Sequence, residues 1–115
     1  MDNKNKTYSS IFKIFGKNVR LCRTSLDWSQ EDLANESGVS ISVIGPMERG
    51  ERSLSFISVY AVCQSIGVTI DKMIQETSVI DLINGNPTFS KKVNGKIKKK
   101  HRIRSGETTA LKKGR

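Results

Sequence analysis

Residues 29–50, with the sequence SQEDLANESGVSISVIGPMERG, constrain the fold of this chain more than any other segment. Ser29 and Asp32 have the spacing of a capping box, in which two side chains satisfy free amides at the start of a helix. Gly38 stands where that helix must end in a left-handed conformation, which glycine adopts without Cβ strain. Ser40 can cap a second helix directly afterwards. The segment therefore predicts two helices joined by a tight glycine turn.

Apolar residues indicate how these two helices pack. Leu33 faces inward on the first helix, Val39 fills the turn, and Ile44 and Met47 share one face of the second helix. This arrangement packs two helices at a steep angle, as in the helix-turn-helix unit whose second helix enters the major groove of DNA. The sequence therefore points to double-stranded DNA as the partner.

The apolar spacing elsewhere predicts an all-α domain of five helices. One apolar stripe on the first helix consists of Phe12, Phe15, Val19, Cys22 and Leu26. The expected helices cover residues 10–24, 30–37, 41–49, 55–65 and a short segment that opens at residue 70. On the fourth helix, Ile57 and Tyr60 are expected to face the core along with residues 61 and 63–66.

Charge divides the chain near residue 85. Residues 1–84 hold nine Lys and Arg against ten Asp and Glu, whereas residues 85–115 hold eleven against one. The NGNP sequence at residues 84–87 is a strong helix breaker, and the lysine-rich residues after it are poor in apolar side chains. We expect a flexible N-terminus over 1–9, a folded domain over 10–84 and a disordered basic tail over 85–115. The tail is either a non-specific nucleic-acid arm or a solubilising end.

The residue inventory argues against several classes of protein. The single histidine, His101, lies in a lysine run, and no catalytic or phosphate-cradling motif is visible, so neither an enzyme nor a cofactor or metal site is expected. Cys22 and Cys63 lack zinc-ligand spacing and are expected to be small buried side chains. With no membrane-length apolar run and no apolar signal region, we expect a cytoplasmic protein without membrane contact or small-molecule ligand.

RTSLDWSQEDLANESGVS, the ERG that follows and SIGVTIDKMI near residue 70 resemble a known family, the Cro/C1-type (XRE) helix-turn-helix domains of lambdoid phage repressors and small bacterial regulators. The resemblance covers about residues 15–74, and the combination of SQEDLA with ERGER looks most similar to the controller proteins of restriction–modification systems. It implies a phage-repressor-like domain that acts as a transcriptional regulator and binds an operator as a homodimer.

The resemblance also implies roles for individual residues. Gln30 matches a contact to a backbone phosphate at a helix amino end, and Arg49 and Arg52 match further backbone contacts. Arg23 and Glu48 match an ion pair that joins the first helix to the end of the third. The recognition-helix positions that lie towards the bases are Ser40, Ile41, Ser42, Val43 and Pro46.

The recognition helix departs from the family's pattern in two ways. Helical periodicity places Ser42, Gly45, Pro46 and Arg49 on its outer face, which offers few of the side chains that read bases. Pro46 falls inside the helix, where it removes an amide and costs about 3 kcal/mol, so a kink or a restarted helix is expected. Both features leave a second function open: a protein-interaction module, such as an antitoxin or an anti-repressor partner, with weakened DNA reading.

A last apolar group exceeds what a short fifth helix needs for docking. It consists of Ile74, Val79, Ile80, Leu82 and Ile83. We expect this group to form the dimer surface. A two-fold dimer would match two half-sites about one helical turn apart on DNA.

Overall fold

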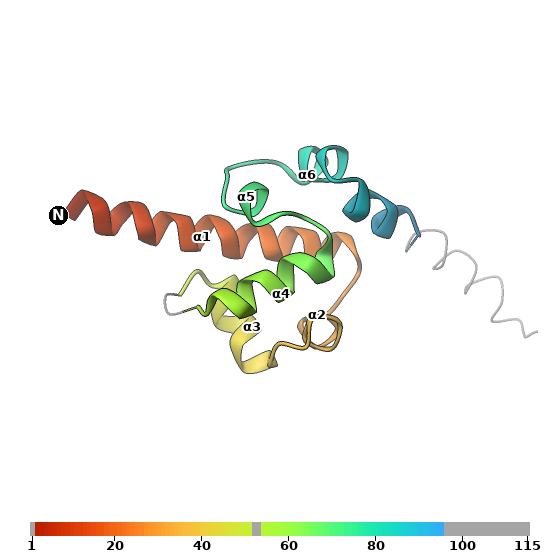
Figure 1. Cartoon of the computed structure of the whole chain (residues 1–115), viewed down its shortest axis with the longest axis horizontal. Coiled ribbons are helices and arrows are strands. Elements are labelled where there is room, and N and C mark those ends of the chain that lie inside the picture. The colour runs from red at the N-terminus through yellow and green to blue at the C-terminus, as the bar shows by residue number, and fades with distance from the viewer. Residues whose placement is uncertain (1, 52–53, 96–115) are drawn as a thin grey trace, which may run out of the picture.

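The computed structural model describes residues 2–51 and 54–95, with side chains from residue 9 onward. Within these ranges the chain is all-α, as the sequence predicts (Figure 1). The helices are α1 (Asp2–Ser25), α2 (Gln30–Ser37), α3 (Ile41–Glu48), α4 (Phe56–Ile66), α5 (Ile70–Met73) and α6 (Val79–Gly85). Residues 87–95 form one more helical segment, so the described part of the chain has seven rather than five. None of the described helices has the length and hydropathy of a membrane span.

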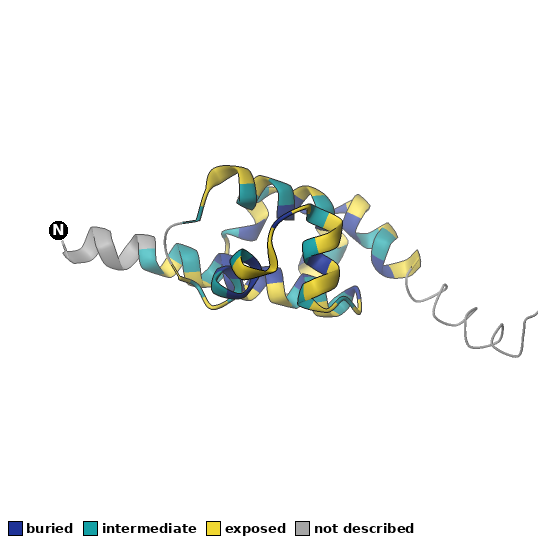
Figure 2. Ribbon diagram, turned by 90° about the horizontal axis from the view of Figure 1, so that it is seen from below, coloured by how far each residue is buried: buried dark blue, intermediate teal, exposed yellow. Residues whose placement is uncertain are grey.

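The long helix α1 is the element on which most of the other helices pack. It contacts α3, α4, α5 and α6, and its predicted apolar stripe is buried apart from the half-buried Phe12. The core that meets this stripe includes Leu33, Val39, Ile44, Met47, Val62, Cys63, Ile66, Val68, Met73 and Leu82. Figure 2 shows helices that each carry buried and exposed residues, with one face in this core.

The helix α1 begins at Asp2, whereas the sequence predicted a flexible segment over residues 1–9 and a helix from residue 10. The prediction placed the start at the first residue of the apolar stripe. Residues 2–9 contain no proline or glycine, and adding residues to an existing helix costs little once it has nucleated. The helix therefore extends beyond the residues that bury it.

Hydroxyl side chains set the helix starts in this fold. Each helix from α2 to α6 has a Ser or Thr N-cap, namely Ser29, Ser40, Ser55, Thr69 and Ser78. The predicted capping box at α2 is present in both directions: Asp32 N donates to Ser29 Oγ at 2.9 Å, and Ser29 N donates to Asp32 Oδ2 at 2.8 Å. The left-handed Gly38 ends α2 with a φ of 76°, as predicted.

The folded domain extends to residue 95, so the predicted boundary at residue 84 is too early. The NGNP sequence does end α6, but Pro87 is also the first residue of the next helix, a position where its fixed φ suits a helix start. Phe89 is fully buried in this segment and Val93 is 8% exposed. The segment packs against the turn after α4, where the added Cβ of any other residue at Gly67 would come within 3.0 Å of Phe89 N.

The outer face of α4 also differs from the sequence prediction. Ile57 is 73% exposed and Tyr60 49% exposed, although both were expected to face the core. Val62 and Ile66 fix the buried direction of this helix, and at about 100° per residue Ile57 falls on the opposite side.

The crossing of α1 and α3 depends on the absence of a side chain at Gly16. A Cβ at this position would overlap the backbone oxygen of Met47 and lie 2.8 Å from that of Glu48. We expect Gly16→Ala to lower the free energy of unfolding by about 1–3 kcal/mol, because overpacking against rigid backbone outweighs the helix propensity of alanine. Urea denaturation measures the change.

The matched control for Gly16 is Gly85, where an added Cβ meets nothing within 4 Å. Gly85→Ala should be neutral or stabilise the protein by about 0.4–1 kcal/mol, since it only reduces the freedom of the unfolded chain. Equal urea midpoints for the two variants would show that α1 and α3 are not held at this distance.

Candidate nucleic-acid interface

The helix α3 packs on α1 and α2 and leaves one side uncovered. Ser42 and Arg49 are exposed on that side, and Ile41 is 50% exposed. Val43 and Pro46 are half-buried. The uncovered side therefore presents one hydroxyl, one guanidinium and apolar groups, much as the sequence predicted.

Gly45 is buried, although helical periodicity placed it on the outer face. Two polar side chains cover it: Arg49 Nη1 lies 3.3 Å and Gln30 Oε1 4.0 Å from the position that a Cβ would occupy. Periodicity predicts the direction in which a residue points, but not whether long neighbouring side chains fold over it.

The two hydroxyls at the start of α3 are linked to each other. Ser40 is the N-cap, and its Oγ accepts a hydrogen bond from Ser42 N at 3.2 Å. The Oγ atoms of Ser40 and Ser42 lie 2.8 Å apart, and either can be the donor. Ser42 can therefore present its hydroxyl to a ligand as donor or acceptor, with Ser40 taking the complementary role.

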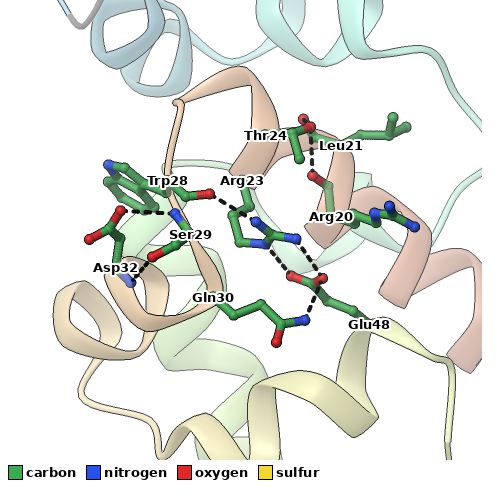
Figure 3. Close-up of polar contacts among 9 residues, drawn as sticks. All are labelled: Arg20, Leu21, Arg23, Thr24, Trp28, Ser29, Gln30, Asp32 and Glu48. Carbon is green, nitrogen blue, oxygen red and sulfur yellow. Dashed lines mark hydrogen bonds and ion pairs between the residues drawn. The ribbon is translucent and has the colours of Figure 1, made fainter.

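Arg23 and Glu48 form the ion pair that the family resemblance implies (Figure 3). Arg23 Nε donates to Glu48 Oε2 at 2.6 Å and Arg23 Nη2 to Glu48 Oε1 at 3.0 Å. The side chains are only 12% and 5% exposed. The pair therefore joins α1 to the end of α3 with bidentate geometry, largely away from water.

Two further groups complete this network. Arg23 Nη1 donates to the backbone oxygen of Trp28 at 2.8 Å, and Gln30 Nε2 donates to Glu48 Oε1 at 3.1 Å. Gln30 is thus held by the buried pair, and its amide nitrogen keeps one hydrogen for another acceptor. The half-buried Trp28 packs against the core directly before α2.

Arg20 belongs to the same surface, although the sequence analysis did not single it out. A pocket of about 190 Å³ is lined by Arg20, Arg23, Gln30, Gly45, Glu48 and Arg49. Within the described residues Glu48 pairs with Arg23, and the exposed Arg49 Nε lies 2.8 Å from Glu51 Oε2, whereas Arg20 forms no ion pair. Arg20 lies one helical turn before Arg23, and this spacing is the signal that could have identified it.

Pro46 lies inside α3, which is continuous from Ile41 to Glu48. The helix therefore does not break and restart at Pro46, which was one of the two expected outcomes. We expect Pro46→Ala to raise the free energy of unfolding by about 1–3 kcal/mol, because it restores an amide to the Ser42 carbonyl and removes the ring. Pro87→Ala is the control: this proline starts a helix, and its removal should cost up to about 1 kcal/mol. A lower urea midpoint for Pro46→Ala would mean that the ring is fitted to its site.

The predicted dimer surface is only partly available in the folded protein. Leu82 is 2% exposed and belongs to the core, so its assignment to an interface is wrong. Ile74 and Ile83 are half-buried against the same core, Val79 is half-buried, and Ile80 alone of the five is exposed, at 65%. Packing of α6 against α1 uses the apolar residues that the sequence left without a partner.

The two cysteines are buried, as predicted, and each is a free thiol. Burial raises the pKa of each thiol to about 12, and the nearby Cys63 adds to the rise at Cys22. Both thiols therefore stay protonated at neutral pH and are poor nucleophiles. Among residues 2–51 and 54–95, no cluster of His, Cys, Asp and Glu could hold a metal ion. Arg52 and His101 lie outside the described residues.

Comparison with known proteins identifies the unit formed by α2 and α3. The helix-turn-helix family matches residues 19–73. The chain is 30% identical over 67 residues to control protein C.SmaI of Serratia marcescens, spanning 58% of this chain and 80% of that protein. It is 28% identical over 61 residues to the uncharacterized HTH-type transcriptional regulator YazB of Bacillus subtilis (strain 168), spanning 53% of this chain and 88% of that one. No solved structure matches the chain significantly. The chain belongs to the XRE-type helix-turn-helix family of DNA-binding transcription regulators.

Proposed function

We propose that this protein is a sequence-specific transcriptional regulator that binds an operator as a homodimer. The observation that carries the proposal is the uncovered side of α3, which stands beside the pocket lined by Arg20, Gln30 and Arg49. An exposed helix flanked by guanidinium groups suits a major groove bordered by phosphates. Similarity to a control protein and to a transcriptional regulator supports the same role.

Contacts to the DNA backbone are assigned to three residues. Gln30, held by Glu48, offers its remaining amide hydrogen to a phosphate at the amino end of α2. Arg49 is exposed, and its pairing with Glu51 is a surface contact that a phosphate can replace at little cost. Arg52 has the corresponding role by its place in the motif. These contacts position the protein but do not distinguish sequences.

Base reading is assigned to the start of α3. The Ser42 hydroxyl, backed by Ser40, can meet a base edge as donor or acceptor. Ile41 is exposed enough to contact a thymine methyl group, with Val43 and Pro46 as further apolar contacts. A face with few polar groups should read a short, partly degenerate half-site.

Selection of bound sequences from random DNA, followed by mobility shifts at two salt concentrations, tests the proposal. We expect an enriched two-fold-symmetric sequence with half-sites about one helical turn apart. Ser42→Ala should reduce discrimination between sequences, whereas Arg49→Ala should weaken binding to all sequences alike. The absence of any enriched sequence with folded protein would contradict the proposal.

The alternative function is a protein-interaction module, and the exposed Ile41 beside so few polar groups favours it. A module of this kind would use the same uncovered side of α3 to bind another protein, as an antitoxin or an anti-repressor partner does. In the selection experiment it would bind DNA weakly and without sequence preference. Retained discrimination that Ser42→Ala lowers would exclude it.

A further inference from the structure

The outer face of α4 carries the largest contiguous group of exposed apolar side chains in the described part of the chain. Phe56 is 70% exposed, Ile57 73% and Tyr60 49%. At about 100° per residue these three residues fall within one quarter to one third of the helix circumference, so they form a single patch, the α4 patch. The Phe56 and Tyr60 rings are stacked, with centroids 6.3 Å apart and planes 24° from parallel.

Nothing within the described fold covers this patch. The inner side of α4 packs on α1 and α2 through Val62, Cys63 and Ile66, and the α4 patch points the other way. The other large exposed apolar residues, Ile41 and Ile80, lie on different helices and stand alone. A contiguous apolar patch on a protein surface, unlike a single exposed residue, marks a contact with another molecule.

We propose that the α4 patch is the surface through which two copies of this chain dimerise. The proposal rests on the operator-bound homodimer proposed above and replaces α6 as its interface. The helix α4 carries no charged residue in FISVYAVCQSI, although 27% of the chain is charged. In a two-fold interface the same patch meets itself, so a patch with charges of a single sign would repel its copy. An uncharged aromatic and aliphatic patch is complementary to itself.

The chemistry of the patch also argues against DNA as its occupant. Among the residues that the structure describes, the exposed neighbours Ser55 and Gln64 are uncharged, so neither offers a cation to a phosphate. Aromatic side chains with few charges are instead typical of the centre of a protein–protein interface. Ile57 of one copy can pack on the stacked rings of the partner, which gains apolar contact without burying an unpaired charge.

The area of the patch sets the strength of the dimer. Three large side chains with these exposed fractions offer roughly 290–480 Å² per copy, taking about 150–250 Å² for a full side chain. A stable interface buries about 800 Å² per partner. The α4 patch is thus about half of a standard interface, and the free protein should be in a concentration-dependent equilibrium between monomer and dimer. Neighbouring half-sites on DNA would raise the effective concentration and complete the dimer.

Sedimentation equilibrium of the full chain without DNA, over a wide range of protein concentrations, tests the inference. We expect Ile57→Glu and Phe56→Glu each to raise the dimer dissociation constant about tenfold or more, since a carboxylate would be desolvated in an apolar contact. Both side chains are mostly exposed in the monomer, so urea midpoints should match the parent. The matched control is Ile80→Glu, because the Ile80 side chain is 65% exposed on α6, outside the α4 patch. This variant should leave the dissociation constant unchanged.

Three results would overturn the inference: a parent protein that is monomeric throughout, a dissociation constant unaffected by Ile57→Glu, or an equal rise with Ile80→Glu. The selection from random DNA separates this inference from the proposed function. If an operator is selected but Ile57→Glu does not change the dissociation constant of the dimer, the proposed function is supported and the proposed interface is wrong. If the dimer depends on Ile57 but the protein selects no DNA sequence, the interface is supported and the proposed function is wrong.

Discussion

Replacing Arg23 by alanine should lower the free energy of unfolding by about 3–5 kcal/mol. Glu48 is 5% exposed, and without Arg23 it keeps only the hydrogen bond from Gln30. The backbone oxygen of Trp28 loses its guanidinium donor in the same variant. A buried carboxylate without its cation costs far more than the intact pair contributes. Urea denaturation followed by circular dichroism measures the change.

Two variants separate burial from charge in this experiment. Arg49→Ala breaks an ion pair whose side chains are 63% and 53% exposed, so it should change stability by less than about 1 kcal/mol. Arg23→Lys keeps the charge but cannot make the bidentate contact and the Trp28 contact together, so its loss should be intermediate. A urea midpoint for Arg23→Ala that equals the parent's would show that water reaches Glu48.

The parts of the fold that local chemistry dictates are predictable from the sequence. Ser29, Asp32 and Gly38 act on backbone groups within a few residues, so α2 has the predicted bounds and α3 begins where expected. The Arg23–Glu48 pair spans 25 residues and was predicted only through the family's pattern. Spacing alone does not show which two charged residues meet or that they are buried. Only the resemblance to the family predicted this pair.

Two of the incorrect predictions, the domain boundary at residue 84 and the assignment of Leu82 to an interface, share one cause, which is packing between segments far apart in the chain. The burial of Phe89 depends on α4 ending at Gly67, and Leu82 is buried because α6 reaches α1. Asn18, for which the sequence analysis made no prediction, also depends on distant packing: it is 1% exposed, and its Nδ2 donates to the backbone oxygens of Met73 at 2.8 Å and Gln75 at 2.9 Å. The sequence places a polar residue beside an apolar stripe, but it does not show that two backbone carbonyls from a distant segment accept its hydrogen bonds.

Removing residues 96–115 should weaken binding to every DNA sequence by a similar factor. The chain should be cut after Gly95 and not at the boundary near residue 85 that the sequence predicted, because Phe89 and Val93 are part of the core. The removed residues, which lie outside the described ones, hold nine Lys and Arg against one Glu, whereas residues 1–95 hold eleven against ten. Nearly all of the attraction to a polyanion at long range therefore comes from the tail.

The salt dependence of binding distinguishes this role of the tail from others. Each phosphate neutralised contributes about 0.9 to the slope of log affinity against log salt, so losing about four contacts would cost several thousandfold at 0.1 M salt. The ratio of operator to random affinity should stay nearly constant, since phosphate contacts carry no sequence information. A full-length variant with the tail lysines and arginines changed to glutamine should behave like the truncation, because charge and not length is responsible. An unchanged slope would mean that the tail does not meet DNA, and a collapsed ratio would mean that it reads sequence, as basic arms do in the minor groove.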